Sequence, residues 1–325
     1  MPPKALAIAE ANANIALIKY WGKLARAGNF PAVPSLSLTL DGLRTRTRVE
    51  LDAALSIDEV NLDGEPTSGR PLERVVSILE AFRALTHCQK RARVTTSNDF
   101  PTAAGLASSA SGFAALVTAA NAAYGAEMEL SSLSAMARAA SASAARSLFG
   151  GWAELRVGSE AAAQVAPEDH WPLVLLVAVT ARGKKSIGST EAMNVTRSTS
   201  PYYAAWVEGA PALFEDARAA LLQCDLTRLG CAMEQSTLMM HAVAMTANPR
   251  VLYLAPTTVA VMQLVTALRT SGKDCYFTMD AGPHVKVLCR AEQAKEIQSE
   301  LARVTGVLDV LVARPGPGAR VVDLA

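Results

Sequence analysis

The chain has 325 residues, 50% of them hydrophobic and 19% charged, so it can bury a large core and lacks the composition of a disordered protein. Its formal net charge of +1 gives no electrostatic case for a nucleic-acid partner. No apolar run reaches the length of a membrane span, and the five cysteines and four histidines are scattered without metal-ligand spacing. We therefore expect a cytoplasmic protein with reduced thiols and no membrane partner.

The first third of the chain is predicted to be rich in strands. Residues 4–20 are small and apolar and predict a strand that ends in a turn. Residues 35–40 and 44–51 alternate in polarity and predict two further strands around the turn-forming pair Asp41-Gly42. Apolar residues at helical spacing then predict a helix over 71–88, which is followed by a strand over residues 92–96.

The remainder of the chain is predicted to mix helices with strands. Helices are expected near residues 109–123, 131–144, 201–223, 225–240 and 256–271, and strands over 173–179, 275–279 and 285–289. Because these elements do not follow a strict βαβ alternation, the α+β class is favoured over a doubly wound sheet. The polar stretch at 158–171 is the best candidate boundary, which divides the chain into domains 1–170 and 171–325.

A loop of small residues over 98–113 leads directly into an apolar helix. Such a loop lets backbone N–H groups approach an anion, and the positive end of the following helix points to the same place. The hydroxyls of Ser108 and Ser109 could also donate to phosphate or hold its metal ion. The loop is not a Walker A motif, which occurs nowhere in the chain. An ordinary N-cap on a buried helix would give the same spacing.

Two segments place charged side chains where strands end. In 14–23, Lys19 and Lys23 suit an anionic ligand, although solvated lysines on a structural strand fit as well. In 280–284, Asp280 begins a tight turn between two apolar strands. An acid in that place could act as a general base or contribute electrostatically, although an ordinary hairpin turn needs no such role.

A third segment, 141–151, combines small hydroxyl side chains with one arginine. Ser141, Ser143 and Arg146 lie near a predicted helix terminus. A guanidinium beside small hydroxyls can clamp a diphosphate in a bidentate manner. Close packing of a small-residue helix against a neighbour is the alternative.

These segments together resemble a known family. Residues 101–110 (PTAAGLASSA) resemble the phosphate-loop motif of the GHMP kinase superfamily. Within that superfamily, residues 14–23 (NIALIKYWGK), 143–151 (SAARSLFGG) and 276–283 (YFTMDAGP) resemble the signatures of mevalonate diphosphate decarboxylases. The resemblance extends from about residue 8 to residue 290, with the motifs in the same order.

The resemblance implies a two-domain GHMP kinase-like α+β fold with the active site in the cleft between the domains. The implied reaction is the ATP-dependent decarboxylation of (R)-5-diphosphomevalonate to isopentenyl diphosphate, which releases ADP, phosphate and CO2. Asp280 matches the family's catalytic acid, which orients or deprotonates the tertiary hydroxyl, and Lys19 is expected to pair with it. The resemblance also implies Mg²⁺ bridging the ATP phosphates, with no metal ligand assigned among the side chains, and a homodimer.

The same resemblance assigns the binding residues. ATP is expected to contact Ala104, Gly105, Leu106, Ala107, Ser108 and Ser109. Substrate is expected to contact Tyr20, Trp21, Gly22, Lys23, Arg74, Ser141, Ala142, Ser143, Ala144, Ala145 and Arg146, and also Ser189 and Thr190 in a flexible loop that closes near the transferred phosphate.

The chain also departs from the family pattern. His284 stands where the family usually has Asn, and we expect it to be the departure closest to substrate choice. Gly188 replaces a common Ser. A phosphomevalonate decarboxylase, a mevalonate kinase and a non-catalytic ligand sensor stay open as alternatives, but the presence of Asp280 favours decarboxylation.

Overall fold

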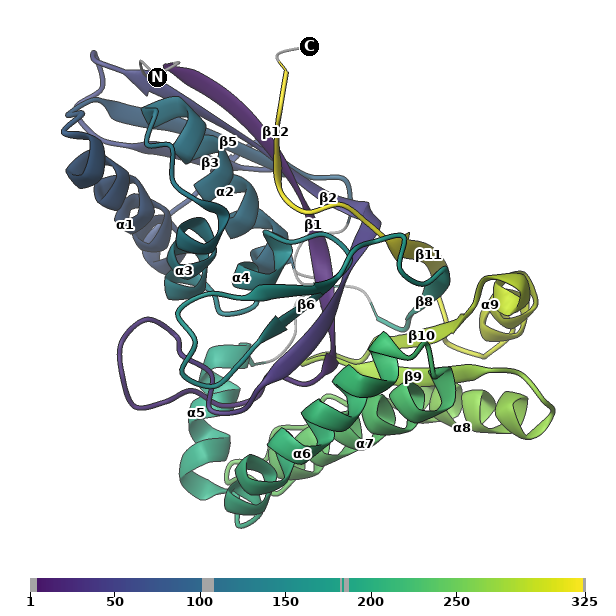
Figure 1. Cartoon of the computed structure of the whole chain (residues 1–325). Coiled ribbons are helices and arrows are strands. Elements are labelled where there is room, and N and C mark those ends of the chain that lie inside the picture. The colour runs from purple at the N-terminus through teal and green to yellow at the C-terminus, as the bar shows by residue number, and fades with distance from the viewer. Residues whose placement is uncertain (1–4, 101–107, 182, 184–186, 324–325) are drawn as a thin grey trace.

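The computed structural model describes residues 5–100, 108–181, 183 and 187–323, and Figure 1 shows the whole chain. Its helices and strands follow one another as β1 (Leu6–Ile18), β2 (Ser35–Asp52), β3 (Glu59–Leu62), β4 (Glu65–Pro66), α1 (Gly69–Thr86), β5 (Arg91–Asn98), α2 (Ser108–Tyr124), α3 (Leu130–Ala140), α4 (Ala144–Ser147), β6 (Trp152–Leu155), β7 (Ala163–Ala166), β8 (Leu173–Val179), α5 (Ser189–Thr199), α6 (Tyr203–Leu222), α7 (Leu226–Met245), α8 (Pro256–Thr270), β9 (Cys275–Met279), β10 (Val285–Arg290), a 3₁₀ turn (Ala291–Gln293), α9 (Ala294–Ala302), β11 (Asp309–Pro315) and β12 (Arg320–Val322).

The described strands join into a single sheet that runs through both halves of the chain. Its order is β4-β3-β5-β2-β11-β8-β10-β9, with β1 beside β2 and β6 also paired to β2. Strand β11 connects the halves, because it pairs with β8 along most of its length and with β2 at Arg314 and Pro315. The last strand, β12, returns to pair with β1. The division at 170/171 stays a prediction, since this sheet crosses it.

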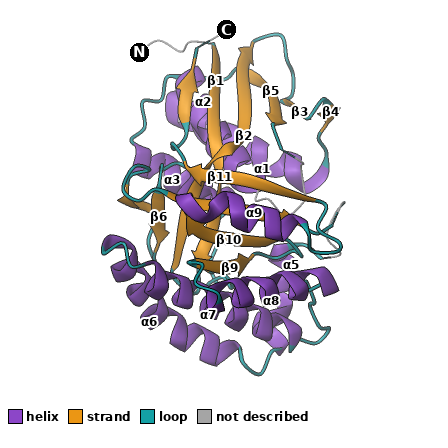
Figure 2. Ribbon diagram, turned by 90° about the vertical axis from the view of Figure 1, so that its right-hand side faces the viewer, coloured by secondary structure: helices purple, strands orange, loops and turns teal. Residues whose placement is uncertain are grey.

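Helices cover the sheet on several sides, which produces the α+β arrangement that the sequence predicts (Figures 1 and 2). Helix α2 packs on β1 and β2 within an apolar core that also includes α1 and α3. Helices α8 and α9 close a second core against β8, β9 and β10. Helices α6 and α7 cover the apolar residues between the halves.

One strand prediction was wrong. The sequence predicts two strands on either side of Asp41-Gly42, whereas β2 runs unbroken from Ser35 to Asp52. Gly42 has a φ of +85°, a left-handed conformation that glycine adopts at little cost, and the register with β1 shifts between Asn12 and Asn14. The Asp-Gly pair therefore bends one long strand as a bulge and does not form a hairpin turn.

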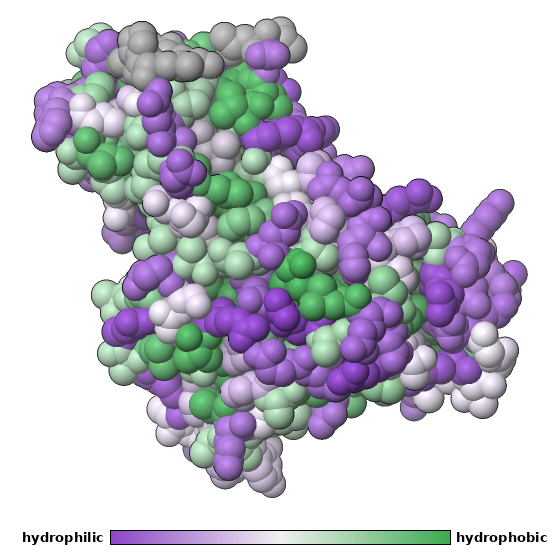
Figure 3. All heavy atoms as spheres, viewed as in Figure 1, coloured by the Kyte–Doolittle hydropathy of each residue, from purple (hydrophilic) through white to green (hydrophobic). Residues whose placement is uncertain are grey.

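The surface shows apolar side chains in patches among hydrophilic ones (Figure 3). Across the part of the chain that is described, none of the helices is both long enough and apolar enough to cross a membrane.

Candidate active site

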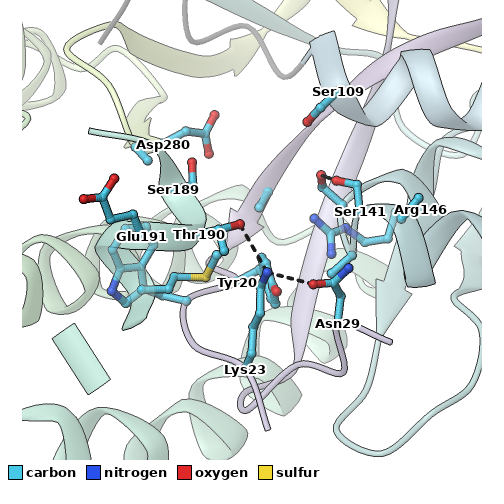
Figure 4. A pocket seen from close by; sticks show the side chains of 18 of the residues that line it. Tyr20, Lys23, Asn29, Ser109, Ser141, Arg146, Ser189, Thr190, Glu191 and Asp280 are labelled. Carbon is cyan, nitrogen blue, oxygen red and sulfur yellow. Dashed lines mark hydrogen bonds between the residues drawn. The ribbon is translucent and has the colours of Figure 1, made fainter. Parts of the chain in front are cut away.

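A cavity of about 830 Å³ opens where the two halves of the chain meet. Its wall is formed by the end of β1, the N-terminal turns of α1, α2 and α5, the segment between α3 and α4, and the turn between β9 and β10 (Figure 4). Most of the predicted site residues lie on this wall: Lys19, Tyr20, Trp21, Lys23, Arg74, Ser108, Ser109, Ser141, Ala142, Ser143, Arg146, Ser189, Thr190 and Asp280.

The carboxylate of Asp280 lies between two ammonium groups. Asp280 directly follows β9, and its Oδ1 accepts a hydrogen bond from Lys19 Nζ at 2.9 Å. Its Oδ2 lies 3.1 Å from Lys286 Nζ, which comes from β10. Lys19 is fixed in turn, because its Nζ also donates to the carbonyl of Ala16 and its backbone N–H donates to Ser236 on α7. The predicted pairing of Lys19 with Asp280 is thus present.

Burial and charge oppose each other at this cluster. Burial alone raises the pKa of Asp280, but the nearby Lys19 and Lys286 outweigh it and hold that pKa well below its ordinary value. Burial lowers the pKa of Lys19 to about 8, although Asp280 opposes the shift. At neutral pH the carboxylate is therefore ionised, and Lys19 is mostly protonated.

Across the cavity from Asp280, Arg146 lies beside Ser141 (Figure 4). The Ser143 hydroxyl also lines this wall, 3.2 Å from that of Ser141. The Arg146 guanidinium is buried and donates to Ser35 Oγ at 2.8 Å and to Asn14 Oδ1 at 3.4 Å, while its Nε has no hydrogen-bond partner among the described residues. No ion pair of the described residues involves Arg146, and burial lowers its pKa to about 10. A charged, buried group that meets only neutral oxygens is poised to bind an anion.

A second group of cations lies around Lys23. Its Nζ donates to Asn29 Oδ1 at 2.8 Å and to Thr190 Oγ1 at 3.2 Å, both neutral acceptors. Burial, together with the smaller effect of the Arg70 and Arg74 charges, lowers the pKa of Lys23 to about 8. The Arg74 guanidinium lies over the Phe113 ring and donates to the carbonyl of Ala140. This region therefore also presents positive charge to the cavity, and Lys23 forms no ion pair with a carboxylate in the part of the chain that the structure describes.

Hydroxyl side chains line the remaining wall. Ser108 and Ser109 begin α2, so their hydroxyls and the positive end of the helix lie at the cavity. The other predicted ATP contacts, Ala104, Gly105, Leu106 and Ala107, lie outside the described residues.

The prediction of a loop at Ser189 and Thr190 was wrong, because both residues lie in the first turn of helix α5. They nevertheless line the cavity. The short, polar sequence of this helix gave little periodic signal.

Some predicted site residues do not line the cavity. Ala144 and Ala145 are fully buried within α4 and pack into apolar cores. Gly22 has a φ of +110° and lies against Tyr203, whose hydroxyl a Cβ at this position would strike. His284 is buried in the turn after Asp280, where its Nδ1 accepts from the backbone N–H of Thr180. His284 therefore anchors the turn to the end of β8, away from the cavity.

The sequence interpretation missed several residues at the site. Lys286 was not singled out, although a lysine in the apolar strand Val285–Arg290 is a usable signal. Asn29, Arg70 and Glu191 line the cavity but come from loops and helix ends without a distinctive pattern.

Comparisons with known proteins agree with this geometry. Residues 11–166 match the diphosphomevalonate decarboxylase-like N-terminal domain, and residues 175–311 match the mevalonate 5-diphosphate decarboxylase C-terminal domain. A diphosphomevalonate decarboxylase from Candida albicans is 34% identical over 294 residues, which are 84% of this chain and 81% of that protein.

Solved structures are similar over nearly the full chain. The mevalonate diphosphate decarboxylase of Staphylococcus aureus is 35% identical, covers 98% of both chains and has a TM-score of 0.92. The structure of MDDEF in complex with MVAPP, AMPPCP and magnesium is 36% identical, covers 98% of this chain and 99% of that one, and has a TM-score of 0.90. The chain therefore belongs to the diphosphomevalonate decarboxylase family.

Proposed function

We propose that this protein catalyses the ATP-dependent decarboxylation of (R)-5-diphosphomevalonate to isopentenyl diphosphate, with release of ADP, phosphate and CO2, in isoprenoid biosynthesis by the mevalonate pathway. The observation that carries the proposal is the ionised Asp280 between two lysines, across the cavity from a buried arginine, Arg146, that forms no ion pair with any described carboxylate. Support comes from membership of the family and from the similar structure that holds MVAPP, AMPPCP and magnesium.

Arg146, Ser141 and Ser143 are the residues we propose for the substrate's diphosphate. The guanidinium already meets hydroxyl and amide oxygens on one side, and its Nε is left to donate. A planar guanidinium matches two phosphate oxygens at once, which fixes the orientation of the diphosphate. With the diphosphate on this wall, the tertiary hydroxyl of the substrate would point toward Asp280.

Asp280 would accept the hydrogen bond of that hydroxyl and orient it for attack on the γ-phosphate of ATP. A carboxylate whose pKa is held this low is a weak base, so orientation is its main contribution. This suits phosphoryl transfer, since its loose transition state requires little proton abstraction. Lys19 would stabilise negative charge on the transferred phosphate. Departure of that phosphate with its bonding electron pair leaves positive charge on the tertiary carbon. The bond between the carboxylate and the neighbouring methylene carbon then breaks, CO2 leaves, and its electron pair forms the C=C bond of isopentenyl diphosphate.

The hydroxyls of Ser108 and Ser109 are proposed to face the ATP phosphates and their Mg²⁺. The described residues hold no group of three or more His, Cys, Asp or Glu side chains placed for a metal ion, so the phosphates themselves would supply most of the ligands. Hydroxyl oxygens at a helix N-terminus fit such a metal–phosphate group. When bound, Mg²⁺ neutralises phosphate charge during transfer.

A substrate panel tests the proposal. Purified protein is given ATP, Mg²⁺ and, in separate reactions, mevalonate, its 5-phosphate or its 5-diphosphate, and both ADP and CO2 are measured. We expect both products from the 5-diphosphate alone. CO2 from the 5-phosphate would make the protein a phosphomevalonate decarboxylase, and ADP without CO2 would make it a kinase. Binding of the ligands without any product would identify a sensor.

A cytoplasmic location, a homodimer and two domains divided at 170/171 also stay proposals. Cell fractionation and light scattering of the purified chain test the first two. Separate expression of 1–170 and 171–325 tests the third, although the shared sheet leads us to expect that neither piece folds alone.

A further inference from the structure

Lys286 occupies an unusual place for a lysine. It lies within the apolar strand β10, its exposed fraction is 0%, and its neighbours Val285 and Val287 belong to the core under α8 and α9. Its own side chain projects to the opposite face, where its ammonium reaches Asp280 Oδ2 at 3.1 Å. Among the described residues, Asp280 is its one carboxylate partner within 4 Å.

Fold stability alone does not explain this lysine. Removing an ammonium from water costs several kcal/mol, and pairing often fails to recover that cost compared with an apolar residue of similar volume. A leucine or methionine would suit a strand of this kind, as Leu288 shows two residues later on the same face. A function for Lys286 through Asp280 explains why the cost is accepted.

The geometry shows what Lys286 adds. Lys19 donates a hydrogen bond to Oδ1, and the Lys286 ammonium forms an ion pair with Oδ2, so a cation flanks each oxygen and restrains the carboxylate from rotating. Oδ2 accepts no hydrogen bond among the described residues, so it keeps lone pairs for another donor. The other charged or titratable groups that face the cluster are Arg146 on α4 and His241 on α7. Burial lowers the pKa of His241 to about 4, so it is neutral at pH 7.

We propose that Lys286 is a positioning residue for the decarboxylation reaction: it acts with Lys19 as a two-sided clamp that fixes the Asp280 carboxylate in one rotamer and in its ionised form. This inference rests on the proposed function. It assigns no contact between Lys286 and substrate, since Lys286 does not line the cavity.

The first test is Lys286→Met, which keeps the side-chain length and removes the charge. We expect kcat to fall on the order of tenfold or more while KM stays within about threefold, because the change affects the reacting geometry and not the binding residues. The acid limb of the kcat–pH profile should move to higher pH, since a cation that favours the ionised carboxylate has been removed. Lys273→Met is the matched control, because Lys273 pairs with Glu296 at 2.6 Å on the surface. An unchanged kcat and pH profile in folded Lys286→Met would overturn the proposal.

A double-mutant cycle with Asp280→Asn distinguishes positioning from a general role in folding. Asp280→Asn alone leaves two buried ammonium groups without a carboxylate, so adding Lys286→Met should raise Tm or leave it unchanged. In the wild-type background the same substitution also takes a cation from the ionised Asp280, so it should raise Tm less than in the Asp280→Asn background, or lower it. A fall in Tm of equal size in both backgrounds would show that Lys286 only supports the fold, even if Lys286→Met alone is too unstable to assay.

The double-mutant cycle measures Tm and needs no catalysis. A failure of the proposed function can therefore be distinguished from a failure of the proposal for Lys286. Wild-type protein that releases no CO2 would refute the proposed function, whereas Tm would still report whether Lys286 acts through Asp280. With an active wild type, additive Tm effects would refute the clamp alone.

Discussion

Lysine side chains lie in two regions at the cavity, and their partners differ; Lys19 and Lys23 line it, and Lys286 lies behind its wall. In the region around Asp280, Lys19 and Lys286 meet a carboxylate at 2.9 and 3.1 Å. In the region around Lys23, the hydrogen-bond partners of the ammonium among the described residues are the neutral oxygens of Asn29 and Thr190. Both Lys19 and Lys23 have a pKa lowered to about 8, and burial is the largest cause in each case.

The difference shows which charges are already neutralised by the protein and which are left for a ligand. Asp280 offsets part of the positive charge around it, and the result is one fixed acceptor. Around Lys23, the nearby Arg70 and Arg74 add positive charge, and no ion pair of the described residues joins Lys23 to a carboxylate. We infer that the first region carries out chemistry and that the second binds anions, together with Arg146.

The substitution Asp280→Asn gives the strongest test of the difference between the two regions. We expect kcat to fall on the order of 10² or more, because the amide cannot hold the hydroxyl as the carboxylate does and the two lysines lose their anion. Affinity for ATP and for diphosphomevalonate should change little, as measured by calorimetry. A variant that keeps a large share of wild-type kcat would remove Asp280 from the mechanism.

Arg146→Lys should give the next largest effect, this time on binding. The ammonium cannot make the paired phosphate contacts of a guanidinium, so affinity for diphosphomevalonate should fall on the order of tenfold or more. Affinity for ATP should fall much less. Equal losses for both ligands, measured by titration calorimetry, would assign Arg146 to the fold and not to the substrate.

The pH dependence of substrate binding tests the region around Lys23. Its pKa of about 8 means that the ammonium loses its proton as pH rises from 7 to 9.5, so affinity for diphosphomevalonate should decrease over that range. Lys23→Met should bind more weakly at pH 7 and lose most of the dependence. If the variant retains the full dependence, another group such as Lys19 is responsible.

The smallest expected effect is on stability in acid. The pKa of Asp280 is depressed in the folded protein, so its contribution to stability is present above the ordinary aspartate pKa and is lost as pH falls below about 4. Urea unfolding at pH 3.5 and at pH 6 should therefore show a smaller loss for Asp280→Asn than for the wild type. Identical losses would contradict the depressed pKa.

Secondary structure was predicted well from the sequence where apolar residues recur at a clear strand or helix spacing. Strands β1, β8, β9 and β10 and helices α1, α2, α6, α7 and α8 all lie where apolar spacing places them. The interpretation missed α9, although Ile297 and Leu301 give a helical spacing. It also missed β11 and β12, because these strands are defined by pairing with partners far away in the chain.

The site residues also fall into those that the sequence identified and those that only the folded chain could reveal. Motifs identified Asp280, Lys19 and Arg146, and the structure places all three on one cavity. Contiguous motifs also included Ala144 and Ala145, since a motif does not distinguish residues that face a site from residues that pack behind it. Lys286 could not be assigned to Asp280 before the hairpin of β9 and β10 placed the two side chains together.

The most direct measurement follows ADP and CO2 in one reaction with carboxyl-labelled diphosphomevalonate, ATP and Mg²⁺. The proposed mechanism uses one site for phosphoryl transfer and decarboxylation, so the two products should accumulate in a 1:1 ratio throughout. Neither should form when a non-hydrolysable analogue replaces ATP. ADP that accumulates with a stable phosphorylated product and no CO2, or CO2 released without ATP, would contradict the account.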